Sequence, residues 1–189
     1  MLGLLFSTPN DAVAFVNQCA GARLQAPKIG EYAQVNDILV GVTGVGKIQA
    51  TLQAERMLQN HNLDALLHAG LCTPVADDLP DGELFGVSFV LEGDRVELDA
   101  PTYPRMPLEC PLDTNHEGTL VSQDHISDND EQSYWERLAG VRDSTGYPVA
   151  YVAAQHGTPC HIIKAIAPPN DTEDSRSALA TFLNDELND

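Results

Sequence analysis

The chain has 189 residues, 43% of them hydrophobic, and its 10 basic and 28 acidic residues give a formal net charge of −18. This length and apolar content predict one folded domain over residues 1–189. The negative charge repels phosphate backbones and anionic lipids, so we expect neither a nucleic-acid partner nor a membrane partner for this acidic protein. No apolar run approaches the ~20 residues that span a bilayer. Residues 1–6 are too short a run for a signal peptide, and we expect a cytoplasmic location.

The cysteine and histidine patterns give no ligand set for a metal. The cysteines are widely spaced and form no CxxC pair, and the histidines form no HExxH motif. We therefore expect reduced thiols, no metal site and no cofactor.

Apolar runs and turn residues predict alternating strands and helices along the chain. Buried strands are expected at residues 2–6, 37–42, 64–69, 83–91, 119–122 and 160–167, with an extended piece at 31–35 and an antiparallel strand at 95–98. Helices are expected between a Thr8 cap and Gly21, and at residues 47–59, 127–138, 146–156 and 172–187.

Four prolines interrupt residues 100–117, which excludes helix interior and central strand and predicts a long irregular connection outside the sheet. The alternation elsewhere predicts a single α/β domain with a mostly parallel central sheet and helices on both sides.

A glycine-rich segment, GVTGVG at residues 41–46, precedes the second predicted helix. Loops of this kind offer amide donors to an anion, but this one lacks both a phosphate-loop GK[ST] and the third glycine of a dinucleotide fingerprint. Tight turn geometry alone also explains such glycines. Lys47, just after the loop, either neutralises an anion or is simply exposed. Ser122, Asp124 and His125 have the residue types of a hydrolytic triad, but neighbours in an extended segment point to opposite faces.

Several segments together resemble the nucleoside phosphorylase and nucleosidase superfamily, especially bacterial nucleosidases for methylthioadenosine, adenosylhomocysteine or futalosine. They are VGVTGVGK at 40–47, LLHAG at 66–70, LPDGEL at 79–84, GTLVSQD at 118–124, DSTGYPVAY at 143–151 and HIIKAIA at 161–167. The resemblance covers nearly the whole chain. It implies a nucleosidase-like fold, a purine nucleoside or related ligand, and hydrolysis of the N-glycosidic bond. Self-association, as a homodimer, is implied by the resemblance alone.

The same resemblance implies roles for individual positions. Gly44, Gly46 and Gly70 would shape the floor of the ligand site, Ile126 and Ser127 would border the base, and Thr145 would face the ribose.

Three positions depart from the chemistry of the superfamily. Thr145 stands where those proteins have a ribose-binding glutamate, and Pro168 stands where they have the aspartate that protonates the purine. Leu71 replaces a phosphate-contacting serine, which disfavours phosphorolysis. Asp171 is the nearest carboxyl that could replace the acid lost at Pro168, provided that it is enclosed in the site; the alternative is a charge at the start of the final helix. The sequence thus leaves two hypotheses, a divergent nucleosidase and a catalytically degenerate relative kept for ligand binding or subunit assembly.

Overall fold

The computed structural model describes residues 1–20, 25–75, 79–94, 104–125, 128–168 and 172–188. The strands in these residues are β1 (Leu2–Phe6), β2 (Tyr32–Val35), β3 (Ile38–Val42), β4 (Ala65–Pro74), β5 (Leu84–Glu92), β6 (Arg105–Pro107), β7 (His116–Ser122), β8 (Val141–Asp143) and β9 (Cys160–Ile166). The helices are α1 (Pro9–Ala20), α2 (Lys47–Asn60), α3 (Asn129–Trp135), α4 (Gly146–His156) and α5 (Glu173–Asn188).

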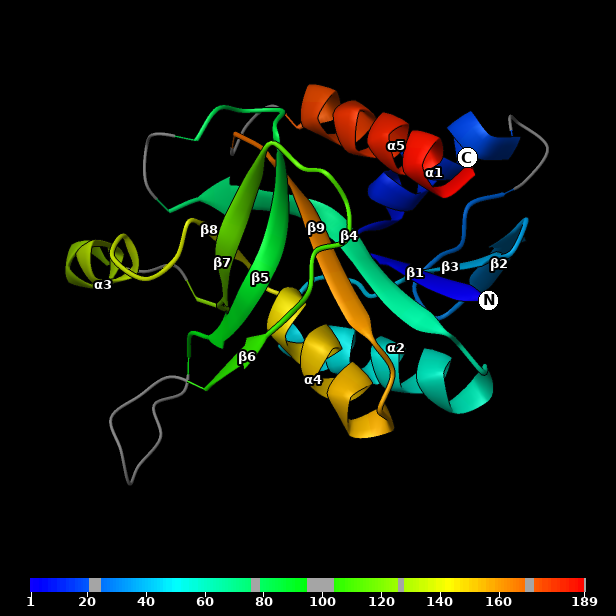
Figure 1. Cartoon of the computed structure of the whole chain (residues 1–189), viewed down its shortest axis with the longest axis horizontal. Helices are drawn as coiled ribbons and strands as arrows, with labels where there is room; N and C mark the ends of the chain where they lie inside the picture. The colour runs from blue at the N-terminus through cyan, green and yellow to red at the C-terminus, as the bar shows by residue number, and fades with distance from the viewer. Residues whose placement is uncertain (21–24, 76–78, 95–103, 126–127, 169–171, 189) are drawn as a thin grey trace.

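Helices cover both faces of one sheet: α1 and α5 lie on one face, and α2 and α4 lie on the other (Figure 1). The strands follow the order β2-β3-β1-β4-β8-β7-β5-β6, and β9 pairs with both β4 and β5. All the predicted buried strands therefore share one sheet. The three-layer α/β architecture expected from the sequence is confirmed.

The sheet is mixed, so the expectation of a mostly parallel sheet needs correction. Within the described residues five strand pairs are parallel and four are antiparallel. Strands β4, β9, β5, β7 and β8 pair in a closed circuit, because β9 bonds β5 as well as β4, and β8 bonds β4 as well as β7. Two of the pairings in this circuit, β4 with β8 and β5 with β9, are antiparallel.

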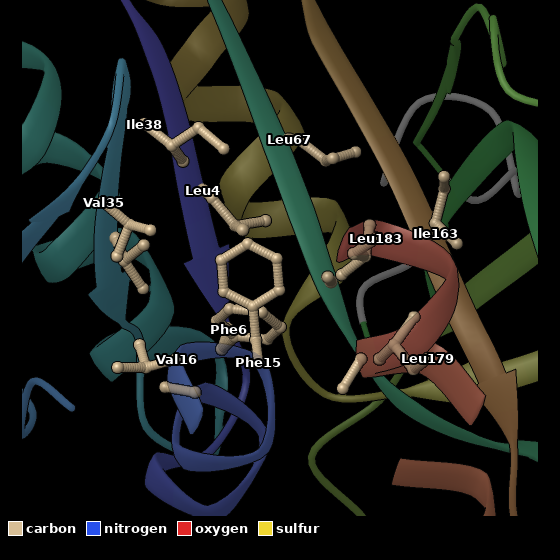
Figure 2. Close-up of a cluster of buried hydrophobic side chains, with 14 of the residues drawn as sticks. Leu4, Phe6, Phe15, Val16, Val35, Ile38, Leu67, Ile163, Leu179 and Leu183 are labelled. Carbon is tan, nitrogen blue, oxygen red and sulfur yellow. The ribbon is translucent and has the colours of Figure 1, made fainter. Parts of the chain in front are cut away.

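Period-two alternation explains why β1 is apolar throughout. Leu4 and Phe6 pack with α1 and α5, while Leu5 between them packs toward α2 and α4. Figure 2 shows the first of these cores, in which the Phe6 ring lies next to Phe15 of α1 with centroids 5.5 Å apart. A strand buried on both faces has no polar side, which is the pattern read from the sequence.

The structure differs from several of the predicted elements. The helix predicted at 127–138 is α3, Asn129–Trp135. The strand predicted at 64–69 continues to Pro74, which places Gly70 inside β4 and not in a loop after it. The connection predicted at 100–117 contains β6, which pairs with β5, and the first residues of β7. No local pattern predicts the three-residue strand β8. The strand predicted at 95–98 lies outside the described residues.

Candidate active site

A cavity of about 360 Å³ lies at the carboxyl ends of β1, β4, β7, β8 and β9. Parallel strands end at the same edge of a sheet, and ligands of α/β proteins commonly bind at that edge. Ten of the fifteen lining residues are polar or charged, but most of the surface that faces the cavity is apolar; the apolar residues include Leu71 and Cys72 of β4 and the Ala167-Pro168 turn after β9. The polar and charged residues are Ser7, Thr8, Asp11, Thr73, Gln123, Arg142, Asp143, Ser144, Thr145 and Thr172.

A buried ion pair supports the cavity from beneath. Lys164 of β9 is fully buried, and its Nζ lies 2.8 Å from Oδ2 of Asp143, which is 4% exposed. Burial alone would raise the pKa of the Asp143 carboxyl, but the Lys164 ammonium lowers it to about 2, so this carboxyl is ionised at neutral pH. We call Ser7, His68, Asp143, Thr145 and Lys164 the Lys164 cluster.

His68 of β4 is the neutral member of the Lys164 cluster. Burial lowers the pKa of its imidazole, and the Lys164 charge lowers it further to about 3. Its Nδ1 lies 2.9 Å from the carbonyl oxygen of Leu5, which can only accept a hydrogen bond, so Nδ1 carries the ring proton. The unprotonated Nε2 then accepts from Lys164 Nζ at 2.9 Å.

Gly70 provides the space in which these side chains meet. It is paired in register with Lys164 on β9 and follows His68 on the same face of β4. A Cβ atom at Gly70 would lie 2.2 Å from Ser7 Oγ and 2.7 Å from Ser7 Cβ. A glycine is therefore required here for packing, and not for a turn.

Asp143 also fixes the start of helix α4. Its carboxylate accepts from the Gly146 amide at 2.9 and 3.1 Å, and from the Ser122 hydroxyl at 2.7 Å. Ser122 in turn accepts from the Tyr147 amide at 2.8 Å. Ser122 is therefore hydrogen-bonded to Asp143 and to the first turn of α4. The His125 ring nitrogens instead lie 2.6 Å from Asp94 Oδ1 and 2.8 Å from Glu131 Oε2. Ser122, Asp124 and His125 therefore do not form a hydrolytic triad with one another, as neighbouring positions in an extended segment led us to expect.

A second buried carboxylate lines the cavity at the start of α1. The Thr8 amide donates to Asp11 Oδ2 at 3.1 Å and the Asp11 amide lies 3.4 Å from Thr8 Oγ1, which confirms the predicted Thr8 cap. Arg176 of α5 donates from Nε to Asp11 Oδ1 at 3.0 Å. Asp11 therefore also carries a paired negative charge.

The predicted ligand-site residues are only partly gathered at the cavity. Thr145 lines it, and so does Pro168, the position where the resemblance implies a general acid. Gly70 lies behind the wall, next to Ser7. Ile126, Ser127 and Asp171 are outside the described residues.

The glycine-rich loop reaches the cavity through Val45, which lies between Gly44 and Gly46. Gly44 and Gly46 have φ angles of +79° and +90°, which glycine adopts without strain. The Gly46 amide donates to Ser144 Oγ at 3.2 Å, and the Lys47 amide donates to Asp124 Oδ1 at 3.1 Å. The start of α2 thus has side-chain acceptors of its own. Lys47 Nζ pairs with Glu92 and Asp94, which is neither of the two roles considered from the sequence.

Sequence reasoning missed Lys164, His68 and Asp143, although two of them carried a signal. Lys164 and His68 each stand alone in an apolar strand, in HIIKAI and ALLHAG. A charged side chain in a strand buried on both faces needs a buried partner of opposite charge. That argument would have identified Lys164 as a member of an ion pair, but not Asp143 as its partner.

Comparison with known proteins gives the fold class of the chain. No protein-family profile matches the sequence, and no curated protein matches it. Solved structures match nearly the whole chain. The 5′-methylthioadenosine/S-adenosylhomocysteine nucleosidase from Helicobacter pylori superposes with a TM-score of 0.82 at 17% identity, over 99% of this chain and 97% of that chain. This agreement confirms that the chain has the fold implied by its resemblance to the nucleosidases.

Two further structures show the same likeness. Futalosine hydrolase of Helicobacter pylori matches with a TM-score of 0.82 at 16% identity, covering 99% of this chain and 97% of that one. The nucleosidase of Campylobacter jejuni matches with a TM-score of 0.77 at 14% identity, covering 98% and 97%. A mutant of the Helicobacter pylori nucleosidase holds 5′-methylthioadenosine in its active site. At these identities the likeness establishes the fold, and the chemistry must be argued from this chain's own residues.

The described part of the chain has neither a membrane-spanning helix nor a metal-binding cluster of side chains. None of the helices there is long and apolar enough to cross a membrane. No group of three or more histidine, cysteine, aspartate or glutamate side chains in those residues is arranged to hold a metal ion.

Proposed function

We propose that this chain binds a purine nucleoside or a related ligand in the cavity beside the Lys164 cluster, and that slow hydrolysis of the N-glycosidic bond is the reaction its architecture supports. One observation carries the proposal: in a nucleosidase fold, a cavity of about 360 Å³ at the strand ends is lined by hydroxyl groups and two carboxylates. This volume lies in the range of small-molecule sites. The hydroxyls suit a sugar, and the apolar wall at Val45, Leu71 and Ala167 suits a base.

Arg142 supplies a donor on the same cavity wall. Its Nη2 donates to Gln132 Oε1 at 3.0 Å, while its buried Nε has no hydrogen-bond partner within the described residues. Buried donors are normally paired, and Arg142 is a residue of the cavity wall, so a ligand that reaches Nε would need an acceptor atom. Purine ring nitrogens and carbonyl oxygens are acceptors of this kind.

The missing proton donor limits the reaction. Pro168 lies on the cavity wall and has no ionisable group, and the lowered pKa of Asp143 keeps that carboxyl ionised. Asp11 is held by Arg176. General acid catalysis contributes about 10²- to 10⁴-fold to such reactions, so we expect turnover far below the ~1–10³ per second of ordinary enzymes. Asp171 remains our candidate for a substitute acid.

The second candidate function is ligand binding without catalysis. The specific observation in its favour is that both carboxylates on the described cavity wall are committed to cations, Asp143 to Lys164 and Asp11 to Arg176. The lowered pKa of Asp143 makes that carboxylate a poor proton donor.

The two functions are separated by measuring binding and turnover on the same protein. Calorimetric binding should be determined for methylthioadenosine, adenosylhomocysteine, futalosine, inosine and adenosine, and release of free base should be followed by chromatography over long incubations. We expect binding of at least one nucleoside with slow release. Binding without release favours the second candidate, and no binding to any of the five contradicts both.

A restored acid tests the role of position 168. We expect Pro168→Asp to raise base release by about 10²-fold, because it returns a carboxyl to the position where the resemblance implies one. Pro168→Asn is the matched control, since it has nearly the same shape and cannot donate a carboxylic proton. Asp171→Asn should abolish the residual release if Asp171 is the substitute acid.

A further inference from the structure

Arg142 is the one cationic side chain among the described residues that line the cavity. In the antiparallel pair of β4 and β8 it lies directly opposite Thr73, and directly opposed side chains share one face of a sheet. Leu71 lies two positions before Thr73 on β4 and therefore shares that face as well. Both also line the cavity. The Arg142 side chain thus stands beside Leu71 and Thr73 on the same wall.

The guanidinium of Arg142 is oriented by the protein but little used by it. Nη2 donates to Gln132 Oε1 at 3.0 Å, and Gln132 is itself held because its Nε2 donates to the Val75 carbonyl. A guanidinium has five N–H donors, and this is the one hydrogen bond that Arg142 makes within the described residues. Nε is the one unpaired nitrogen of Arg142 that is enclosed, so Nη1, which also has no partner in those residues, is accessible. Nη1 and the second hydrogen of Nη2 are therefore left for a ligand.

The positive charge of Arg142 is also without a counter-ion in the described part of the chain. Both carboxylates of the cavity wall are paired with other cations. Glu131 acts on Arg142 only at a distance, and its Oε2 lies 2.8 Å from His125 Nε2. Burial lowers the pKa of Arg142, but a guanidinium remains ionised at neutral pH. A half-buried cation with unused donors favours a ligand group that only accepts hydrogen bonds.

The position of Arg142 in the sheet indicates which part of a nucleoside it would meet. The Ala167 amide donates to the Cys72 carbonyl at 2.9 Å, so the Ala167-Pro168 turn lies next to β4 on one side. Arg142 lies next to β4 on the other side. A base packed against the apolar wall at Leu71 and Ala167 therefore has one edge near β8, where Arg142 stands.

We propose that Arg142 is a specificity-determining residue that binds the acceptor edge of an oxopurine, so that the site selects 6-oxopurine nucleosides over 6-aminopurine nucleosides. The inference rests on the proposed nucleoside-binding function and names the class of base; no role for position 142 follows from the resemblance. Two N–H groups of a guanidinium match the O6 and N7 acceptors of an oxopurine, which is how arginine reads guanine in DNA. Adenine has an amino donor in place of O6, and a guanidinium cannot accept from it.

The unmodified protein tests this selectivity with inosine and adenosine, which share one sugar and differ at position 6 of the base. We expect calorimetry to give a dissociation constant for inosine about 10- to 100-fold below that for adenosine. 7-Deazainosine keeps O6 but lacks N7, and it should bind more weakly than inosine. Adenosine bound as tightly as inosine would overturn the inference while leaving the proposed nucleoside binding intact. If no nucleoside binds, both fall.

The Arg142→Gln variant separates recognition of the base from support of α3 through Gln132. A glutamine amide both donates and accepts, and it matches N6 and N7 of adenine. The preference for inosine should therefore fall to within about threefold or reverse. Arg137→Gln removes the same charge from an exposed position and should leave the preference unchanged. A purely supporting role would weaken both nucleosides equally, and an unchanged preference in Arg142→Gln would contradict the inference.

Nitrogen NMR follows the contact in the unmodified protein, independently of whether Arg142→Gln folds. The guanidinium resonances of Arg142 can be assigned through bonds from its own backbone. Saturation with inosine should shift them, because a new acceptor joins Nη1 and Nη2, and should leave those of the exposed Arg137 in place. Arg142 resonances that bound inosine does not shift would overturn the inference.

Discussion

Two clusters near the carboxyl ends of the strands each combine one lysine and one histidine with one or more carboxylates, and they differ in burial. In the Lys164 cluster, Lys164 is fully buried and His68 has a lowered pKa. In the other, the Lys47 cluster of Lys47, Glu92, Asp94, His125 and Glu131, the His125 side chain is 44% exposed.

The two histidines respond in opposite ways to their surroundings. Hydrogen bonds to Glu131 and then Asp94 raise the pKa of His125, because solvent keeps the cost of its charge small. Burial dominates at His68 and lowers its pKa despite the nearby Asp143. The same residue types therefore give a fixed neutral acceptor inside the protein and a titratable cation at its surface.

The largest expected difference between the clusters is in stability. Lys164→Met leaves the Asp143 charge buried without its cation, and we expect the free energy of unfolding to fall by about 3–5 kcal/mol. Lys47→Met should cost less than this, because its partners Glu92 and Asp94 are 15% and 26% exposed and keep part of their hydration. Urea unfolding of both variants checks this. Equal losses would show that burial does not distinguish the two clusters.

Packing around the buried cluster can be probed at Gly70. We expect Gly70→Ala to destabilise the protein by about 1–3 kcal/mol, because the new methyl group would overlap Ser7. Ser7→Gly removes both close atoms, so Gly70→Ala should cost much less in that background. A double-mutant cycle of unfolding free energies measures the coupling. Additive effects would contradict the close contact.

Acid should destabilise the protein through His68. The unfolded chain binds a proton near the ordinary histidine pKa of ~6.5, whereas folded His68 does so only near 3. The contribution of His68 to the free energy of unfolding therefore has its full value above the histidine pKa of the unfolded chain. It falls as the pH drops below that pKa, by up to about 1.4 kcal/mol per pH unit. Asp143 adds a further loss below its unfolded pKa of ~3.9. Urea unfolding between pH 7.5 and 5.5 should show this slope, and His68→Asn should reduce it.

The smallest expected effect concerns His125 and has the opposite sign. Its raised pKa means that its contribution is complete below the unfolded pKa and is lost as the pH rises through the folded value. His125→Asn should therefore reduce the free energy of unfolding by less than about 1 kcal/mol at pH 5.5, and by still less at pH 8.5. A larger loss at the higher pH would show that His125 acts as a neutral residue.

The elements that the sequence predicted well are those with local signals. Helix α4 has the predicted bounds, Gly146–His156, because its apolar face and its C-terminal Gly157 lie within one short segment. Strand β8 could not be predicted, since three residues of mixed polarity form a strand only between β7 and β4. The continuation of β4 beyond Gly70 likewise depends on its partners β8 and β9.

Local pattern and the resemblance determined the layered α/β fold and singled out Thr145 and Pro168, both of which line the cavity. They did so because alternation and strand ends are properties of neighbouring residues. Tertiary structure alone decided the Lys164 cluster, whose members Ser7 and Lys164 are separated by 157 positions. A buried lysine shows that a partner must exist, but only the register of β1, β4, β8 and β9 places Asp143 and His68 around it. Desolvation at that place then sets the charge on each group.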